Sequence, residues 1–127
     1  MNYVIETKYK KDMRYPTAGD YFPIKKDIMK IEICKQLNED YEFCILIHEM
    51  IEEFLTRKRN IAEQSITDFD LMFESERELG IHTEDAEPGQ DLRAPYRKEH
   101  IFSENVERLI AAEIGVDWKS YGEDIIS

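Results

Sequence analysis

Two residues whose types suit metal binding or acid–base chemistry lie one helical turn apart in an apolar segment. His48 and Glu52 are four positions apart, so on a helix they share one face. The other residues on that face are mostly apolar, namely Tyr41, Cys44, Ile45, Ile51 and Leu55. Because an isolated polar group on a buried apolar surface is unfavourable, this pair needs a partner: a hydrogen bond, an ion pair or a metal ion.

A second stripe of the same kind lies nearer the C-terminus. His100, Ser103, Glu107 and Ala111 follow one edge of an apolar helix face, and the small Ser103 and Ala111 would let another helix come close. If the two helices pack together, both histidine–glutamate pairs converge. Two imidazoles and one or two carboxylates suit Zn²⁺, Mn²⁺ or Fe²⁺.

Asp70 is a further candidate oxygen ligand, because it flanks the buried stripe of a helix between the other two. A competing interpretation makes Asp70 the third residue of a capping pair with Thr67, and this interpretation is favoured by the spacing. The remaining histidine, His82, lies in an acidic segment and is expected to be solvated.

Residues 48–52, His48-Glu49-x-x-Glu52, resemble the zincin motif H-E-x-x-H, with Glu52 in place of the second histidine. In zincins the glutamate after the first histidine serves as general base. The resemblance therefore implies that Glu49 is catalytic, with His48, Glu52 and His100 as the metal ligands.

Apolar periodicity predicts an α+β fold: an N-terminal antiparallel β-hairpin or small sheet packed on a three-helix core. Residues 3–9 alternate weakly, as an edge strand does. Residues 14–22 carry the turn signals Pro16 and Gly19-Asp20, and residues 28–34 have apolar side chains at alternate positions. The chain is predicted to be a single domain over 1–127, with strands within residues 1–36.

Three helices are predicted within residues 38–118. The first follows the N-cap residue Asn38, ends near Lys58 and is apolar almost all round, which indicates a buried central helix. The second starts at Ser65 or Thr67, and a mobile loop at about 80–95 follows it. The third runs from Pro95 to Gly115, and its apolar face is expected to be buried; this face comprises Phe102, Val106, Leu109, Ile110 and Ile114.

Composition narrows the range of partners. The chain has 28 acidic and 17 basic residues, a net charge of −11, so it repels a phosphate backbone and we expect no nucleic-acid partner. No apolar run reaches the ~20 residues of a membrane helix, so we expect no membrane partner. The N-terminal residues do not show the basic and then apolar pattern of a signal peptide, so we expect a cytoplasmic protein. Cys34 and Cys44 are expected to be reduced core residues.

The chain as a whole resembles a group of short proteins encoded by tailed phages and bacterial prophages. The similarity rests on RYPTAGD (14–20), HEMIE (48–52), FDLMFE (69–74), APY (94–96) with EH (99–100), and residues 107–118. It implies a shared fold and adds no chemistry, because no activity is established for the group.

Two classes of function stay open. The first is a small metal-dependent hydrolase acting on a peptide, a nucleotide or another phosphoester; the Glu49-x-x-Glu52 word would also suit a Mg²⁺-binding nucleotide pyrophosphatase, although the histidines and the hairpin fit such enzymes poorly. The second is a non-enzymatic phage accessory protein whose acidic surface binds a basic host protein. In that case the histidines and glutamates form a structural network.

Overall fold

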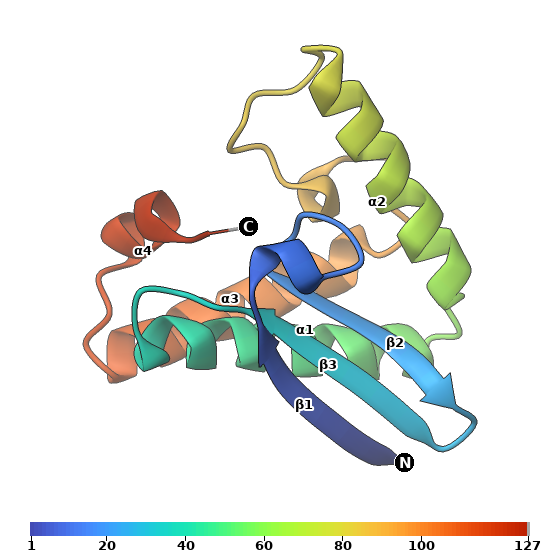
Figure 1. Ribbon diagram of the computed structural model, residues 1–127, viewed down its shortest axis with the longest axis horizontal. Coiled ribbons are helices and arrows are strands. Elements are labelled where there is room, and N and C mark those ends of the chain that lie inside the picture. Colours follow the sequence, from blue (N-terminus) through green and yellow to red (C-terminus); the bar gives the residue numbers. More distant parts are fainter. Residues whose placement is uncertain (127) are drawn as a thin grey trace.

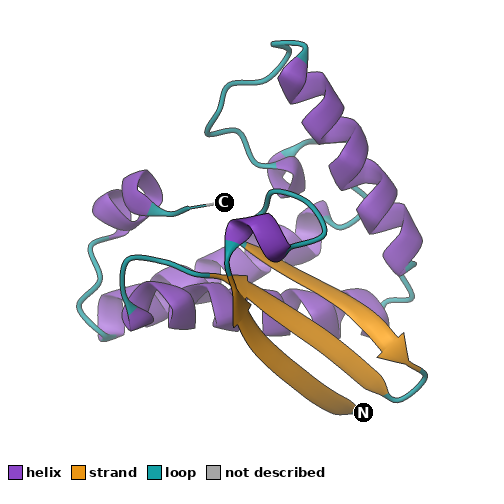
Figure 2. Ribbon diagram, viewed as in Figure 1, coloured by secondary structure: helices purple, strands orange, loops and turns teal. Residues whose placement is uncertain are grey.

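The N-terminal third of the chain forms a three-stranded sheet. The computed structural model describes residues 1–126, and its strands are β1 (Asn2–Lys8), β2 (Gly19–Lys25) and β3 (Ile28–Cys34), in the order β1-β3-β2. Four α-helices follow within the described residues, so the predicted α+β class is confirmed. Figures 1 and 2 show the sheet on one side of the helices.

The sheet is mixed, whereas the sequence predicted antiparallel strands. β2 and β3 form the expected hairpin, but β1 pairs parallel with β3, with Ile5 opposite Ile31. The short helix η1 (Lys10–Asp12) and the loop after it carry the chain from the end of β1 past the end of β3. β2 therefore occupies the far edge, and β3 returns between the other two strands in the same direction as β1.

The predicted helices are present with small changes in their ends. α1 spans Glu39–Lys58 and α3 spans Arg97–Glu113, with Gly115 in the left-handed conformation (φ 79°) that ends a helix. α2 starts earlier than predicted, at Glu63, and spans Glu63–Glu78. A fourth helix that was not predicted, α4 (Trp118–Asp124), follows α3.

α1 is the central helix that the sequence predicts, but the side chains that it buries most deeply do not include its phenylalanines. The α1 residues buried most deeply are Tyr41, Cys44, Ile45, His48, Glu52, Glu53 and Thr56. Phe43 and Phe54, on the opposite face, are 43% and 48% exposed. The helix therefore packs through a stripe that is largely polar.

α3 shows the same inversion. Its buried residues are Glu99, Ser103, Glu107 and Ala111, whereas Phe102 and Leu109 of the predicted apolar face are 53% and 70% exposed. α1 and α3 run antiparallel and side by side, and α1 also packs against β2 and β3 (Figure 1). The polar stripes of the two helices thus face each other in the interior of the protein.

The apolar core lies beside this polar interface. The side chains of Ile31 and Ile33 on β3 are buried against α1, and Phe73 of α2 is also almost fully buried. Cys34 and Cys44 are buried and unbridged, as predicted. None of the helices in residues 1–126 has the length and apolar character needed to cross a lipid bilayer.

The N-terminus of α1 gives a test of local stability. Asn38 Oδ1 accepts a hydrogen bond from the backbone N–H of Tyr41 at 2.9 Å. Replacing Asn38 by Ala removes this cap and is expected to lower the free energy of unfolding by about 1 kcal/mol, measured by urea denaturation. Asn105→Ala, at an exposed position inside α3, is the control and should be neutral or slightly stabilising. Equal losses in both variants would contradict the capping role.

Candidate metal centre

α1 presents three acid–base side chains to the interior. His48 and Glu52 lie one turn apart on its buried face, and Glu49 lies beside them and is half-buried. α3 supplies His100 and Glu107 from the stripe that faces α1. The antiparallel packing of the two helices brings the histidines together although they are 52 positions apart in the chain, as predicted.

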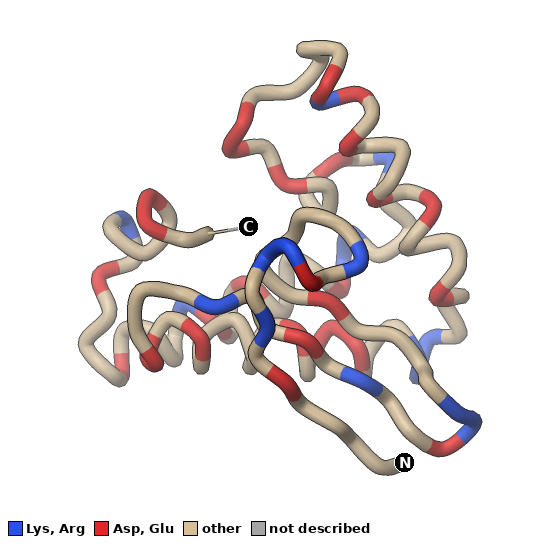
Figure 3. The backbone as a smooth tube through the Cα atoms, in the orientation of Figure 1, with Lys and Arg blue, Asp and Glu red and all other residues tan. Residues whose placement is uncertain are grey.

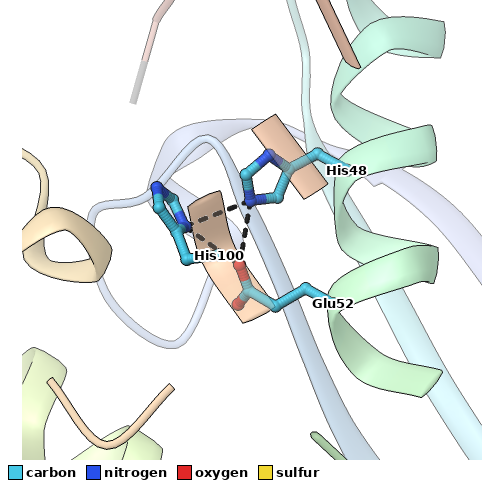
Figure 4. A group of neighbouring side chains, drawn as sticks. All are labelled: His48, Glu52 and His100. Atoms are coloured by element: carbon cyan, nitrogen blue, oxygen red, sulfur yellow. Dashed lines mark hydrogen bonds and ion pairs between the residues drawn. The ribbon is translucent and has the colours of Figure 1, made fainter. Parts of the chain in front are cut away.

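Three potential ligand atoms meet at one point (Figure 4). Glu52 Oε2 lies 2.9 Å from His48 Nε2 and 3.0 Å from His100 Nδ1, and these two nitrogens are 3.2 Å apart. Ligands held ~2.1 Å from a common ion are about 3.4 Å apart in a tetrahedral site and about 3.0 Å apart on an octahedral face. The triangle therefore has the size that a divalent ion requires.

The second ring nitrogen of each histidine contacts a carboxylate. His48 Nδ1 is 2.7 Å from Glu107 Oε1, and His100 Nε2 is 3.0 Å from Glu87 Oε2. In metal sites the ligating histidines commonly donate their other N–H to a carboxylate, which fixes the ring orientation. Glu107, predicted as a ligand, thus orients His48 through the nitrogen that points away from the triangle.

Tyrosines complete the hydrogen bonding of the carboxylates. The Tyr121 hydroxyl of α4 donates to Glu107 Oε2 at 2.5 Å, and the Tyr21 hydroxyl of β2 donates to Glu52 Oε1 at 2.9 Å. Glu52 Oε2 is therefore the oxygen left to face the two imidazoles. Every ligand atom of the triangle belongs to a side chain that is held in place by another element of the fold.

The carboxylates around the histidines outnumber them. Burial disfavours a charged imidazole, but hydrogen bonds to Glu107 and Glu52 outweigh it and raise the pKa of His48 to about 10. Burial also disfavours the charged form of His100. Hydrogen bonds to Glu104, Glu52 and Glu87 outweigh this effect and raise the pKa of His100 to about 12. Two protonated rings in contact repel each other, whereas one divalent ion replacing both protons would neutralise the same carboxylates.

The Glu49 side chain extends from α1 toward the start of β2. Burial, and then the charge of Glu52, raise the pKa of Glu49 well above its usual value. Its side chain lies against Gly19 at the start of β2, where an added Cβ would come within 2.5 Å of the Glu49 Cγ. Gly89, in the short helix η2 (Pro88–Gln90), likewise leaves room for the ring of His100. Two glycines thus let the backbone approach the two side chains closely.

These residues line a cleft of about 830 Å³. RYPTAGD (14–20) forms one wall, and its ends are joined by the ion pair between Arg14 Nε and Asp20 Oδ2 at 2.8 Å. The loop 84–89 and α4 contribute other parts of the lining. Segments that are distant in the sequence therefore meet at one site.

Asp70 lines the cleft but is not among the three converging ligands. Its carboxylate accepts hydrogen bonds from the Tyr96 hydroxyl at 2.5 Å and from the Tyr15 hydroxyl at 3.2 Å. The capping interpretation is wrong, because α2 begins at Glu63 and the Thr67 hydroxyl donates to the Glu63 side chain. Asp70 instead connects α2 to the walls of the cleft.

Sequence reasoning missed several residues of the site. Glu104 is one of them: it lies one turn after His100, 3.6 Å from its Nε2, and this spacing could have revealed it. Glu87, Tyr21 and Tyr121 gave no such signal, because each comes from a different element. The expectation for His82 is also wrong: its ring stacks on Phe73 at 3.9 Å between centroids.

Comparison with protein families, with curated proteins and with solved structures gives no match to this chain. The resemblances to tailed-phage proteins and to the zincin motif stay predictions.

Asp70 gives a test by pH. Burial raises its pKa from 3.8 to about 7, so the folded state binds this proton more tightly than the unfolded state does. The stabilisation is complete below pH 3.8 and is lost as the pH rises through 7. Asp70→Asn, which does not titrate, should therefore be more stable than the parent protein above pH 7, by an amount on the order of 2–4 kcal/mol.

Urea denaturation of the metal-free protein at several pH values measures this difference, which should vanish near pH 4. Asp68→Asn, at an exposed position of the same helix, is the control and should leave the pH profile unchanged. A pH-independent effect of Asp70→Asn would rule out the buried carboxyl as its cause.

Proposed function

We propose that this protein is a small metal-dependent hydrolase whose ion is held by His48 Nε2, Glu52 Oε2 and His100 Nδ1. The observation that carries the proposal is the convergence of these three atoms within 3.2 Å of one another, at the wall of a cleft. Two histidines and one carboxylate suit Zn²⁺, Mn²⁺ or Fe²⁺. Three protein ligands leave a position for water or substrate, as catalytic zinc sites do.

The hydrogen bonds around the triangle support a ligand role over a purely structural one. A structural pair needs only one contact, yet each of these side chains uses its second polar atom on a separate partner. Glu107 and Glu87 orient the rings, and Tyr21 orients Glu52. This is the arrangement that fixes ligand geometry before a metal binds.

Glu49 is the proposed general base. It directly follows His48, lines the same cleft and makes no hydrogen bond to another side chain among the described residues. A carboxylate that is free to accept a proton suits the activation of water. A bound divalent ion would lower the pKa of its water and polarise a substrate carbonyl.

The charge of the cleft favours peptides or other amides over phosphoesters. Within residues 1–126 its lining includes eleven carboxylate side chains and three lysine or arginine side chains. Arg14 and Arg77 already form ion pairs, with Asp20 and Glu74 respectively. Figure 3 shows acidic residues along α2 and the loop after it. The negative charge of the cleft would repel a phosphate group, whereas it would not repel a neutral peptide and would attract a basic one.

The second candidate is a non-enzymatic accessory protein in which the cluster fixes the packing of α1 on α3, with a basic host protein as partner. The observation in its favour is that every buried side-chain polar atom in the described part of the chain has a hydrogen-bond partner without a metal. Metal content separates the two candidates.

Elemental analysis of protein purified without a histidine tag should find one divalent ion per chain, and Glu52→Gln should weaken its binding by ~100-fold or more in a competition titration. The amide keeps the shape of the side chain but removes the charge that a cation needs. Glu39→Gln, an exposed change on the same helix, should bind normally. Unchanged affinity in well-folded Glu52→Gln would exclude Glu52 as a ligand.

Glu49→Gln separates catalysis from metal binding. The metal-loaded variant should keep its ion but lose turnover of a fluorogenic peptide library by about 100-fold or more, because a general base contributes that much to a rate. Glu42→Gln, a neighbour on α1, is the control for the loss of one charge. Full activity of Glu49→Gln would remove it from the mechanism, and a tightly bound ion without turnover in the parent protein would favour a structural metal.

A further inference from the structure

The face of α1 that points away from the cleft is apolar and open to solvent. Phe43 and Phe54 are 43% and 48% exposed, and Ile47 and Met50 between them are half-buried. α3, packed alongside, adds Phe102 at 53% and Leu109 at 70%. Exposed apolar surface of this extent on neighbouring helices usually marks an interface with another molecule.

The spacing on α1 is that of a coiled-coil seam. Asp40, Phe43, Ile47, Met50, Phe54 and Arg57 follow one another at alternating steps of three and four residues. A mean spacing of 3.5 residues keeps such side chains on one line when two helices pack along each other. Within the described structure no helix covers this line, since α3 packs on another side of α1.

The seam is complementary to itself when reversed. Phe43 and Phe54 lie equally far from the middle of the helix, between residues 48 and 49, and so do Ile47 and Met50. The outermost pair at equal distance is Asp40 and Arg57, which are exposed and opposite in charge. Antiparallel packing on an identical helix therefore places Phe against Phe, Ile against Met, and each Asp against an Arg.

We propose that this face binds a second copy of the chain, with α1 packed antiparallel to α1 of the other copy around a two-fold axis beside residues 48 and 49. A parallel arrangement would place like charges together at both ends. An unrelated partner would not require the reversal symmetry that the seam has. The cleft opens on another side of α1, so both copies keep an accessible site.

The area that the exposed face of α1 and α3 would bury is typical of a dimer that dissociates reversibly. Helices of this length span about 30 Å, and two side by side are about 20 Å wide, so each copy would bury about 600 Å². A total buried area of about 1,200 Å² lies at the lower end of the range for stable interfaces. We therefore expect a dissociation constant in the micromolar range.

Sedimentation velocity of the full chain over a range of concentrations tests the proposal, with a dimer of twice 15.1 kDa expected. Phe43→Glu and Phe54→Lys should each weaken the dimer by on the order of 100-fold, because each buries an unpaired charge. The double variant should dimerise again, since antiparallel packing pairs the introduced glutamate with the introduced lysine twice. Only the antiparallel register predicts this rescue, and high salt should weaken it.

Leu79→Glu is the matched control: Leu79 is 78% exposed but lies at the end of α2, away from the seam, so the dimer should persist. Circular dichroism confirms that each variant is folded. A parent protein that stays monomeric at about 100 μM, 100-fold above a dissociation constant of about 1 μM, would overturn the proposal and leave the face to a different partner. A dimer unaffected by Phe43→Glu and Phe54→Lys, or a folded double variant that is not rescued, would overturn the antiparallel α1 interface.

Discussion

The packing of α1 on α3 depends on neutralising a buried group of imidazoles and carboxylates. His48, Glu52, His100 and Glu107 are removed from most of the solvent, where an unpaired charge would be costly. Each of them is paired, and the pairing draws in the rest of the molecule: a tyrosine from β2, a tyrosine from α4 and a glutamate from the loop before η2. The sheet, the C-terminal helix and the loop are thereby tied to the same two helices, which is why one cleft is lined by so many segments.

Local signals in the sequence predicted most of the elements, because caps and turns act over a few residues. Asn38 and Gly115 mark helix ends that the structure places within two residues of the expected positions. Burial was predicted less well. Amphipathic reasoning assumes that the apolar face of a helix turns inward, and on α1 and α3 the polar stripe turns inward instead. That reasoning fails where buried polar groups are fully paired and apolar side chains such as Phe43 and Leu109 stay exposed.

The residues of the site also divide into those that the sequence could predict and those that it could not. The half of the site that lies on helices could be predicted, because His48 with Glu52, and His100 with Glu107, occur at helical spacings with small residues nearby. The supporting half could not be predicted, since Tyr21, Glu87 and Tyr121 are single residues whose roles depend on tertiary contacts. The parallel pairing of β1 with β3 is of this kind too, because it depends on where the loop after β1 leads and not on the pattern of β1 itself.

The two faces of α1 would contribute to its stability in different ways. The part of α1 that packs internally through His48 and Glu52 gains little hydrophobic stabilisation there, since the polar contacts mainly offset the loss of water. Phe43, Ile47, Met50 and Phe54 would supply the missing apolar burial when a second copy covers them. Dimerisation would then stabilise the helix that carries His48, Glu49 and Glu52, by mass action and without contacting the cleft. The proposed metal centre and the proposed interface thus place different demands on one helix, and its sequence meets them on opposite sides.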